Sequence, residues 1–419
     1  MSSISPESPA EPTQLIVFAD DWGRHPSSAQ HLVRELLPGH PTLWVNTVGT
    51  RTPGLNRADL GRACGVLKRW LGGAGAGAGR AGPALPDGLR VVAPRMYPGF
   101  RRGWQRRFNA RQVSGAVRRG LGMTGPKHVG GHPRALDRVV VTTLPITADL
   151  VGKLGADRWV YYCVDDYSQW PGTDHAVMDA MERELVAKVD AVVCVSETLR
   201  GRVASMGRGD STLLTHGVDV EMWQTPAVDS RVSKRWPGDD KPVALFWGLI
   251  DERLDLVWLD ALLAGCPSYL VLAGPRQIEF ANSPGSLGDV SFSVIEQVYL
   301  GPIAQRDLAA HAALAQVLVM PYVDAPVTRA MQPLKLKEYL ATMKPVVVRD
   351  LPATREWADC CDLASSAEQF ALLVRERAQT GAPASQLEAR RRRLPGESWA
   401  GKAQELAAVI HGAGGSPPA

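Results

Sequence analysis

The feature that most constrains the fold is a predicted helix between two apolar strands in the last third of the chain. Residues 316–322 (QVLVMPY) and 345–348 (PVVV) are apolar and rich in β-branched side chains, which is typical of buried parallel strands. Residues 333–341 (PLKLKEYLA) open on a proline, which favours the first helical position, and place Leu336 and Leu340 on one stripe. The pattern predicts a crossover helix whose N-terminus lies at the carboxyl edge of the sheet, where ligands of such folds bind.

The start of this helix carries a cation and a carboxylate in an order that suits a nucleotide. Lys335 lies in the first turn, where free N–H groups and the helix dipole favour an anion, and Glu338 can accept hydrogen bonds from a sugar diol. A diphosphate followed by a ribose fits this arrangement. The alternative is an exposed ion pair between Lys335 and Glu338, worth roughly 0.2–0.5 kcal/mol.

Residues 333–347 (PLKLKEYLATMKPVV) resemble the donor-site helix of GT-B glycosyltransferases, especially the bacterial relatives of glycosyltransferase family four that make envelope and exported polysaccharides. The resemblance implies an α/β fold of two doubly wound Rossmann-like domains that face each other across a cleft. It implies transfer of a sugar from a UDP- or GDP-linked donor to a saccharide or lipid-linked acceptor. In such enzymes the positions of Lys335 and Glu338 lie at the donor diphosphate and the nucleotide ribose.

A chain of 419 residues is too long for one ordinary core, so two domains are expected. The predicted parts are a disordered tail at 1–13, an acceptor-binding domain at 14–220 with a Gly/Ala-rich loop at 72–82, a nucleotide-sugar-binding domain at 221–394, and a helix at 395–412 that crosses back to the first domain. The chain has no apolar run of about 18 residues, and its first residues lack the apolar segment of a signal peptide. We therefore expect a cytoplasmic protein, peripheral at the inner face of the plasma membrane.

Donor contacts are predicted where strands of the second half end. Gly248 follows residues 243–247 (VALFW) and lets a phosphate approach the backbone, and Arg253 can neutralise that phosphate. By resemblance, the donor pocket also includes Gly274, Pro275, Gly301, Tyr322 and Leu334. The sequence contains no DxD-like triad, so we assign neutralisation of the diphosphate to Lys335, Arg253 and the helix N-terminus, with no metal and no cofactor beyond the sugar donor.

Two adjacent carboxylates, Asp165 and Asp166, follow the predicted strand at 159–164 (WVYYCV). Repulsion between them tends to raise the pKa of one toward a value useful for a base, so both are predicted to be catalytic, together with Arg253 and Lys335. The alternative is an Asx-type turn, which is common where Asp precedes Ser and Pro-Gly. The phrase YYCVDDYSQWPG also resembles a signature that borders the interdomain cleft of the same enzymes.

The acceptor is predicted to bind at a polar turn after the first strand, residues 14–19 (QLIVFA). A turn at the carboxyl end of a first strand is a ligand position in this architecture, and in the resembled family it faces the acceptor. The polar residues of the turn are Asp20, Asp21, Arg24 and His25. A helix start capped by Ser27 or Ser28 is the alternative, and it is compatible with the first interpretation.

A basic stretch at 90–134 holds eleven positive charges and no negative one, in a chain whose net charge is +4. The aromatic residues within it are Tyr97, Phe100, Trp104 and Phe108. Cations interleaved with aromatic rings favour an anionic membrane surface or a pyrophosphate-linked lipid as partner. Nucleic acid and a merely solvated face are the alternatives. We expect no nucleic-acid partner.

Two other classes of function stay open. A twin-Rossmann sugar-nucleotide epimerase or oxidoreductase is less favoured, because no predicted strand runs into a GxGxxG motif. A non-catalytic nucleotide-sugar-binding protein would carry the same donor residues.

The resembled glycosyltransferases often have a second Glu at the position of Ala330, so the donor sugar and the stereochemical outcome are left open.

Overall fold

The computed structural model contains two compact units. The first consists of Met1–Leu214 and Ala403–Ala419, and the second of Thr215–Lys402. The structure describes residues 13–23, 27–47, 84–122, 137–170, 172–226, 232, 236–237, 241–266, 268–278 and 297–412. The predicted loop at 72–82, nearly all of the predicted tail, and part of the basic stretch lie outside these residues.

The first unit is built on a parallel sheet in which the described strands have the order β3-β2-β1-β4-β5-β6-β7. The strands are β1 (Gln14–Ala19), β2 (Thr42–Asn46), β3 (Leu89–Val92), β4 (Arg138–Thr142), β5 (Arg158–Cys163), β6 (Ala191–Cys194) and β7 (Thr212–Leu213). In β1 and β5 every residue after the first is buried, as expected for strands covered on both faces. The strand order reverses between β1 and β4, so the ligand position of this sheet lies at the end of β1, where Asp20 follows.

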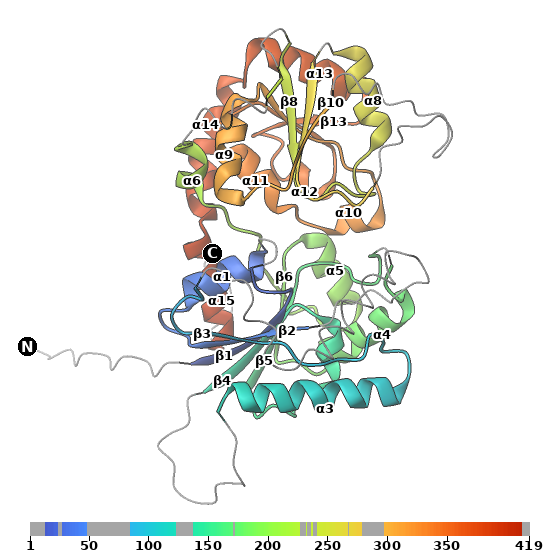
Figure 1. Ribbon diagram of the computed structural model, residues 1–419, viewed down its shortest axis with the longest axis vertical. Coiled ribbons are helices and arrows are strands. Elements are labelled where there is room, and N and C mark those ends of the chain that lie inside the picture. The colour runs from blue at the N-terminus through green and yellow to red at the C-terminus, as the bar shows by residue number, and fades with distance from the viewer. Residues whose placement is uncertain are drawn as a thin grey trace, which may run out of the picture. The chain divides into compact units, whose positions relative to one another are not determined.

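Helices connect these strands, and polar side chains cap several of their N-termini. The helices are α1 (Ser28–Leu36), α3 (Gly103–Gly120), the 3₁₀ helix η2 (Pro145–Asp149), α4 (His175–Val186) and α5 (Glu197–Ser205). Ser27, Asp174 and Ser196 accept backbone hydrogen bonds at the starts of α1, α4 and α5. The long helix α3 packs against β2, β3 and η2 (Figure 1). This packing leaves the opposite face of α3 exposed.

The second unit repeats the design with a parallel sheet whose described strands have the order β10-β9-β8-β11-β12-β13. The strands are β8 (Val243–Trp247), β9 (Tyr269–Ala273), β10 (Gln297–Gly301), β11 (Val317–Met320), β12 (Val346–Arg349) and β13 (Asp362–Ala364). The order reverses between β8 and β11, and the carboxyl ends of these two strands therefore flank the ligand position of this sheet.

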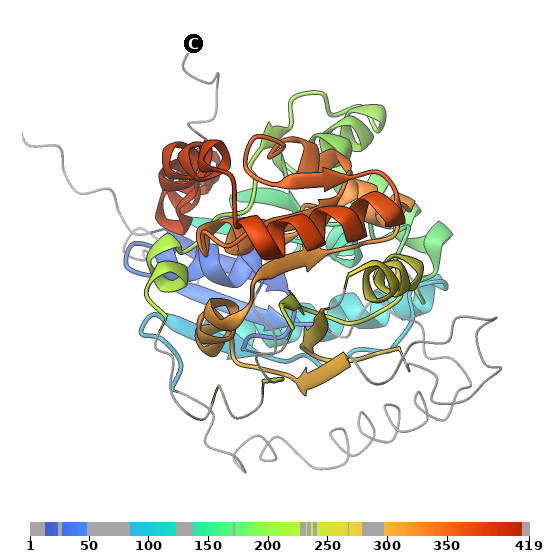
Figure 2. The ribbon, with the colours of Figure 1, turned by 90° about the horizontal axis from the view of Figure 1, so that it is seen from above.

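The helices of the second unit pack around an apolar core that includes all of β8 and β11. They are α6 (Val220–Gln224), α8 (Leu256–Gly265), α9 (Gln305–Leu314), α10 (Pro326–Ala330), α11 (Leu334–Ala341), α12 (Pro352–Arg355), α13 (Ala367–Thr380), α14 (Ala384–Arg393), the 3₁₀ helix η4 (Leu394–Glu397) and the start of α15 (Trp399–Ile410). Helix α13 packs against β11, β12, β13 and α8 (Figure 2). Helix α15 begins in the second unit and ends in the first.

The predicted fold class, two doubly wound α/β domains of Rossmann type, is confirmed by these two sheets. Helix α11 connects β11 to β12 as predicted, but it begins at Leu334, and Pro333 is the extended residue before it. Its first turn therefore lies beside the reversal between β8 and β11. Among the described helices, none has the length and apolar character that crossing a membrane requires.

Candidate active site

Two glycines shape the backbone at the carboxyl edge of the second sheet. Gly248 follows β8 with a φ of +135°, and a Cβ there would lie 2.2 Å from the Nζ atom of Lys335. Gly274 follows β9 with a φ of +139°, and a Cβ there would lie 1.9 Å from the carbonyl oxygen of Gly248. The positive φ disfavours a side chain at both positions, and at Gly274 a Cβ would also clash with the backbone of Gly248. Gly248 and Gly274, two of the predicted donor residues, therefore bring the carboxyl ends of β8 and β9 together. Gly248 also lies next to the side chain of Lys335.

Lys335 brings a positive charge to this edge. Its ammonium donates a hydrogen bond to the hydroxyl of Tyr322, and it lies 4.4 Å from the ring centre of Phe246 and 4.8 Å from that of Tyr322. Aromatic faces attract a cation without neutralising it. Among the described residues no carboxylate lies within 4 Å of this ammonium, so its charge is offset by no ion pair. Such a cation at a helix N-terminus is suited to bind a phosphate group.

Glu338 lies one turn further along α11, and its carboxylate is held by two side chains from other elements. The indole Nε1 of Trp247 donates to one oxygen at 3.1 Å, and the amide Nε2 of Gln305 donates to the other at 2.7 Å. Burial raises the pKa of Glu338, and these two donors act in the opposite direction. Glu338 and Lys335 therefore have separate partners and do not form the exposed ion pair that was the alternative interpretation.

Arg253 lies near this edge but has a carboxylate partner of its own. Its guanidinium forms an ion pair with Asp251, with 2.9 Å between Nη2 and Oδ2, and lies 5.8 Å from the ring centre of Tyr322. Both side chains of the pair are nearly buried. The charge of Arg253 is thus largely offset, in contrast to that of Lys335.

The other predicted donor residues lie in the loops around the same edge. Pro275 follows Gly274, and its carbonyl accepts the backbone N–H of Ile250 at 2.9 Å. Gly301 ends β10 with a φ of +75°, and its carbonyl accepts the backbone N–H of Gly274 at 2.8 Å. Leu334, half-buried, is the first residue of α11. The structure therefore gathers all nine predicted donor residues at the carboxyl ends of β8, β9, β10 and β11.

The predicted acceptor residues follow β1 in the first unit, but only Asp20 and Asp21 are described. The carboxylate of Asp20 accepts hydrogen bonds from Ser27 Oγ and Gln30 Nε2, both at 2.9 Å. Ser27 also caps α1, as the alternative interpretation expected. Asp20 thus ties the turn to the start of α1, while Arg24 and His25 lie outside the described residues.

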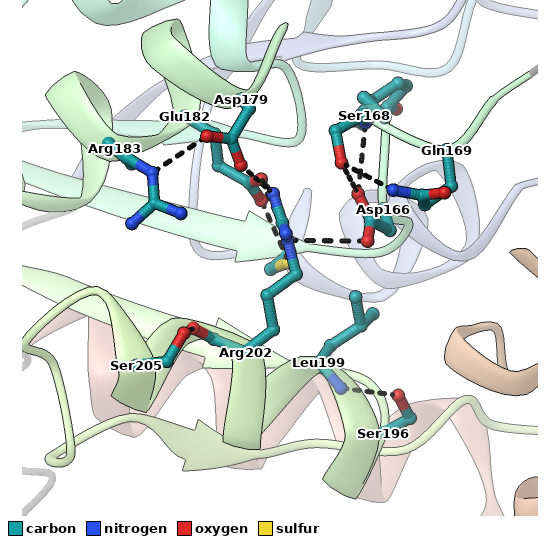
Figure 3. A network of polar contacts seen from close by, with 12 residues as sticks. Asp166, Ser168, Gln169, Asp179, Glu182, Arg183, Ser196, Leu199, Arg202 and Ser205 are labelled. Atoms are coloured by element: carbon teal, nitrogen blue, oxygen red, sulfur yellow. Dashed lines mark hydrogen bonds and ion pairs between the residues drawn. The ribbon is translucent and has the colours of Figure 1, made fainter. Parts of the chain in front are cut away.

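Asp166 belongs to a buried polar network after β5 (Figure 3). One oxygen of its carboxylate accepts hydrogen bonds from the backbone N–H of Ser168 at 3.0 Å and from the Ser168 hydroxyl at 2.5 Å, which is the Asx-type turn of the alternative interpretation. The other oxygen lies 3.5 Å from Nε of Arg202. Asp165 precedes it and is half-buried.

Arg202 connects three carboxylates in this network. It pairs with Asp166, with Asp179 at 2.8 Å and with the fully buried Glu182 at 2.8 Å (Figure 3). Burial raises the pKa of Glu182, and the guanidinium opposes that effect. The network fixes α5 against α4 and the turn after β5, and it holds the carboxylate of Asp166, for which a catalytic role is predicted, in one place.

The sequence did not reveal the partners that hold these side chains. Trp247 was assigned to a buried strand, Gln305 opens a helix of ordinary composition, and Arg202 lies among other arginines. Nothing in residue type or spacing identifies them, because each contact joins elements that are distant in the sequence. Among the described residues, no group of three or more His, Cys, Asp and Glu side chains could hold a metal ion.

Comparisons with known proteins give one curated relative and many similar structures. No family model matches the chain. The chain is 28% identical over 187 residues to "Putative teichuronic acid biosynthesis glycosyltransferase TuaH" of Bacillus subtilis (strain 168). That match covers 42% of this chain and 45% of the relative, so the chain matches less than half of the relative's length.

The similar structures cover nearly the whole chain at low identity. Sucrose-phosphate synthase from Thermosynechococcus elongatus aligns with a TM-score of 0.63 at 14% identity, over 96% of this chain and 99% of that one. The Anabaena protein Alr3699/HepE in complex with UDP and glucose aligns at 0.60 and 12%, over 95% and 99%. The trehalose 6-phosphate synthase of Burkholderia multivorans aligns at 0.59 and 13%, over 96% and 99%. The chain therefore has the GT-B fold of sucrose-phosphate and trehalose-phosphate synthases.

Proposed function

We propose that this protein is a glycosyltransferase, related to glycosyltransferase family four, that transfers a sugar from a UDP- or GDP-linked donor to a saccharide or lipid-linked acceptor in cell-envelope or exopolysaccharide biosynthesis. One observation carries the proposal. Lys335 places an ammonium without a carboxylate partner against Gly248 at the strand-order reversal of the second sheet. The UDP complex of the Anabaena neighbour and the name of the Bacillus relative support a nucleotide sugar and an envelope polysaccharide.

In the proposed reaction, the bond between the anomeric carbon of the sugar and the diphosphate oxygen breaks, and its electron pair stays on the diphosphate. The anomeric carbon forms a bond to an acceptor hydroxyl oxygen, which loses its proton. Negative charge grows on the leaving diphosphate, and Lys335 and the α11 N-terminus stabilise it. Arg253 stabilises the charge of the diphosphate less than Lys335 does, because Asp251 offsets the charge of Arg253. Asp165 and Asp166 remain the candidates to accept the proton, with Asp166 restrained by Ser168 and Arg202.

Release of free nucleotide tests the proposal. Purified protein is incubated with UDP- and GDP-sugars and with a lipid-linked saccharide extract as acceptor, and free UDP and GDP are measured with and without EDTA. We expect release that depends on the acceptor and persists in EDTA, because protein cations serve the diphosphate. An epimerase, an oxidoreductase or a binding protein liberates no nucleotide. If no free UDP or GDP is released with any donor, the proposal is contradicted. Loss in EDTA that Mg²⁺ restores would show that a metal participates.

The acceptor would be reached at a membrane surface through helix α3. Trp104, Arg107, Phe108 and Arg111 recur at the spacing of one helical face, and all four are exposed. We define them as the α3 stripe. Phe100, by contrast, is buried, and Arg106 forms ion pairs with Asp149 and Glu184, so these two residues stabilise the first unit. A stripe of cations and aromatic rings suits an anionic lipid surface.

Replacing Arg107 and Arg111 with serine should weaken binding to acidic vesicles by roughly 30-fold, at about 1 kcal/mol for each cation. The control replaces Arg391 and Arg392, two exposed arginines of α14, and should bind as the unmodified protein does. Co-sedimentation with phosphatidylserine vesicles across a salt series measures both. Salt should weaken the binding of the unmodified protein, because surface attraction is screened over about 10 Å at 0.1 M. Equal loss in the two variants would reject the α3 stripe as the docking surface.

A further inference from the structure

The carboxylate of Glu338 is held by two side chains from other elements of the second unit. Its oxygens receive one N–H each, from Trp247 at the end of β8 and from Gln305 at the start of α9. Three elements of the second unit thus meet at one carboxylate. An ionised carboxylate offers about four lone-pair positions, so each oxygen keeps capacity for one further donor.

The two supports differ in how they are held: ring packing fixes Trp247, whereas Gln305 is placed by its position at the start of α9. The ring of Trp247 stacks on Trp223 with centroids 5.1 Å apart and an interplanar angle of 9°, and it meets the edge of Tyr339 at 4.1 Å. The backbone N–H of Trp247 donates to the Tyr339 hydroxyl at 3.1 Å. Gln305 is the first residue of α9, directly after the turn that follows β10. In the structure these two donors hold the carboxylate in the orientation that a ligand would meet.

Gln305 makes the shorter of the two hydrogen bonds and is the less constrained support. At 2.7 Å its amide is closer to the carboxylate than the indole at 3.1 Å. A hydrogen bond to a charged group is stronger than one between neutral groups. Loss of the Gln305 amide would let the carboxylate turn about the remaining bond to Trp247, and its two oxygens would no longer face a diol together.

We propose that Gln305 is a positioning residue for nucleotide recognition, which orients Glu338 so that both carboxylate oxygens accept hydrogen bonds from the 2′- and 3′-hydroxyls of the ribose of a nucleoside diphosphate. The inference rests on the proposed function and deepens it, since it assigns a role to a residue outside the donor helix. Gln305 touches the carboxylate and not the reacting atoms, so its effect is on affinity and on selectivity for ribose.

The test compares ribose with deoxyribose. The unmodified protein and Gln305→Met are titrated by calorimetry with UDP and 2′-deoxy-UDP, or with GDP and 2′-deoxy-GDP if the protein binds GDP. The unmodified protein should prefer the ribonucleotide. In Gln305→Met the affinity for the ribonucleotide should fall about tenfold, while the affinity for the deoxynucleotide changes less, so the preference shrinks. Gln369→Met, which removes an exposed glutamine of the same unit, is the matched control and should keep the preference.

A pH series separates positioning from a merely structural role. Burial raises the pKa of Glu338, the charge of Lys335 on the same helix lowers it, and the two facing side chains, Trp247 and Gln305, are uncharged donors that also lower it. Removing one donor raises the pKa further, so nucleotide binding should be lost at a higher pH in Gln305→Met than in the unmodified protein when the solution is acidified. A change in folding alone would not move this pH.

The outcomes are distinct. A ribose preference and an acid limit that are unchanged in Gln305→Met overturn the inference and leave the proposed function intact. Failure of the unmodified protein to bind either ribonucleotide overturns both. If Gln305→Met does not fold, Gln305→Asn, whose amide is one methylene short of Glu338, keeps a polar residue at the helix start and should show the same loss of preference.

Discussion

Replacing Lys335 with alanine is expected to lower turnover by roughly 100- to 1,000-fold, the size of effect seen when one group that stabilises transition-state charge is removed. Charge on the leaving diphosphate is larger in the transition state than in the bound donor, so kcat should fall by more than donor affinity. The ammonium donates to the Tyr322 hydroxyl and lies near the rings of Phe246 and Tyr322, with no ion pair among the described residues, so its removal should leave the melting temperature nearly unchanged. Initial rates of nucleotide release and a thermal melt measure the two quantities.

Lys344→Ala is the matched control for this prediction. It removes the same charge just beyond the other end of α11, where the ammonium of Lys344 donates to the carbonyl of Ala313. Its turnover should stay near that of the unmodified protein, because the change lies away from the sheet edge. A folded Lys335→Ala protein with ordinary turnover would reject the assignment of Lys335.

Lys337→Met, two residues away on the same helix, is expected to lower the melting temperature of the second unit by about 10 °C. Lys337 is buried and forms an ion pair with Glu397, and it also donates to the Thr215 hydroxyl at 3.0 Å and to the His216 carbonyl. It thus joins the first and last segments of the unit. Breaking a buried pair costs roughly 3 kcal/mol, and each kcal/mol shifts the melting temperature by about 2–4 °C at this size. An unchanged melting temperature would contradict this account.

The pH dependence of stability gives an independent check on Lys337. Burial lowers its pKa to about 8, against an ordinary lysine value near 10.4 in the unfolded chain. Between these values the unfolded chain binds more protons, so the free energy of unfolding of the unmodified protein should rise relative to Lys337→Met, by up to about 1.4 kcal/mol per pH unit. Below pH 8 Lys337 is protonated in both the folded and the unfolded chain. The difference in free energy of unfolding between the unmodified protein and Lys337→Met should therefore become independent of pH. Urea unfolding from pH 7 to pH 10 measures it.

The strands of both sheets could be predicted because buried parallel strands are short, nearly continuous runs of apolar and β-branched residues. The segment at 243–247 was predicted from its apolar run and is β8 with the same bounds. The apolar residues at 146–154 predict a helix, but the structure has only the 3₁₀ helix Pro145–Asp149, and Gly152 and Gly155 after it adopt positive φ values of 77° and 64° that a continued helix does not allow. The pattern of apolar residues thus indicates where an element lies, but it does not show how far a helix extends before glycines with positive φ.

The interior polar contacts could not be predicted. A run of four arginines, as at 390–393, favours a solvated helix end over contact with a membrane, but Arg390 is fully buried and donates at 2.7 Å to the carbonyls of Cys360 and Lys344. Four identical residues on a helix point in four directions, and sequence does not say which one faces inward. For the same reason the sequence does not distinguish Lys337, which is buried and paired with Glu397, from Lys335, which contacts Tyr322 and has no carboxylate partner among the described residues.

Amide hydrogen exchange with bound nucleotide tests the central claim most directly, because it reports where a nucleoside diphosphate binds. The protein is measured alone and saturated with UDP, and separately with GDP. We expect slower exchange in the second unit at residues 247–253, 273–276 and 333–339, the segments that hold Gly248, Gly274, Lys335 and Glu338. Unchanged exchange in these segments, with slowing confined to the first unit, would contradict it.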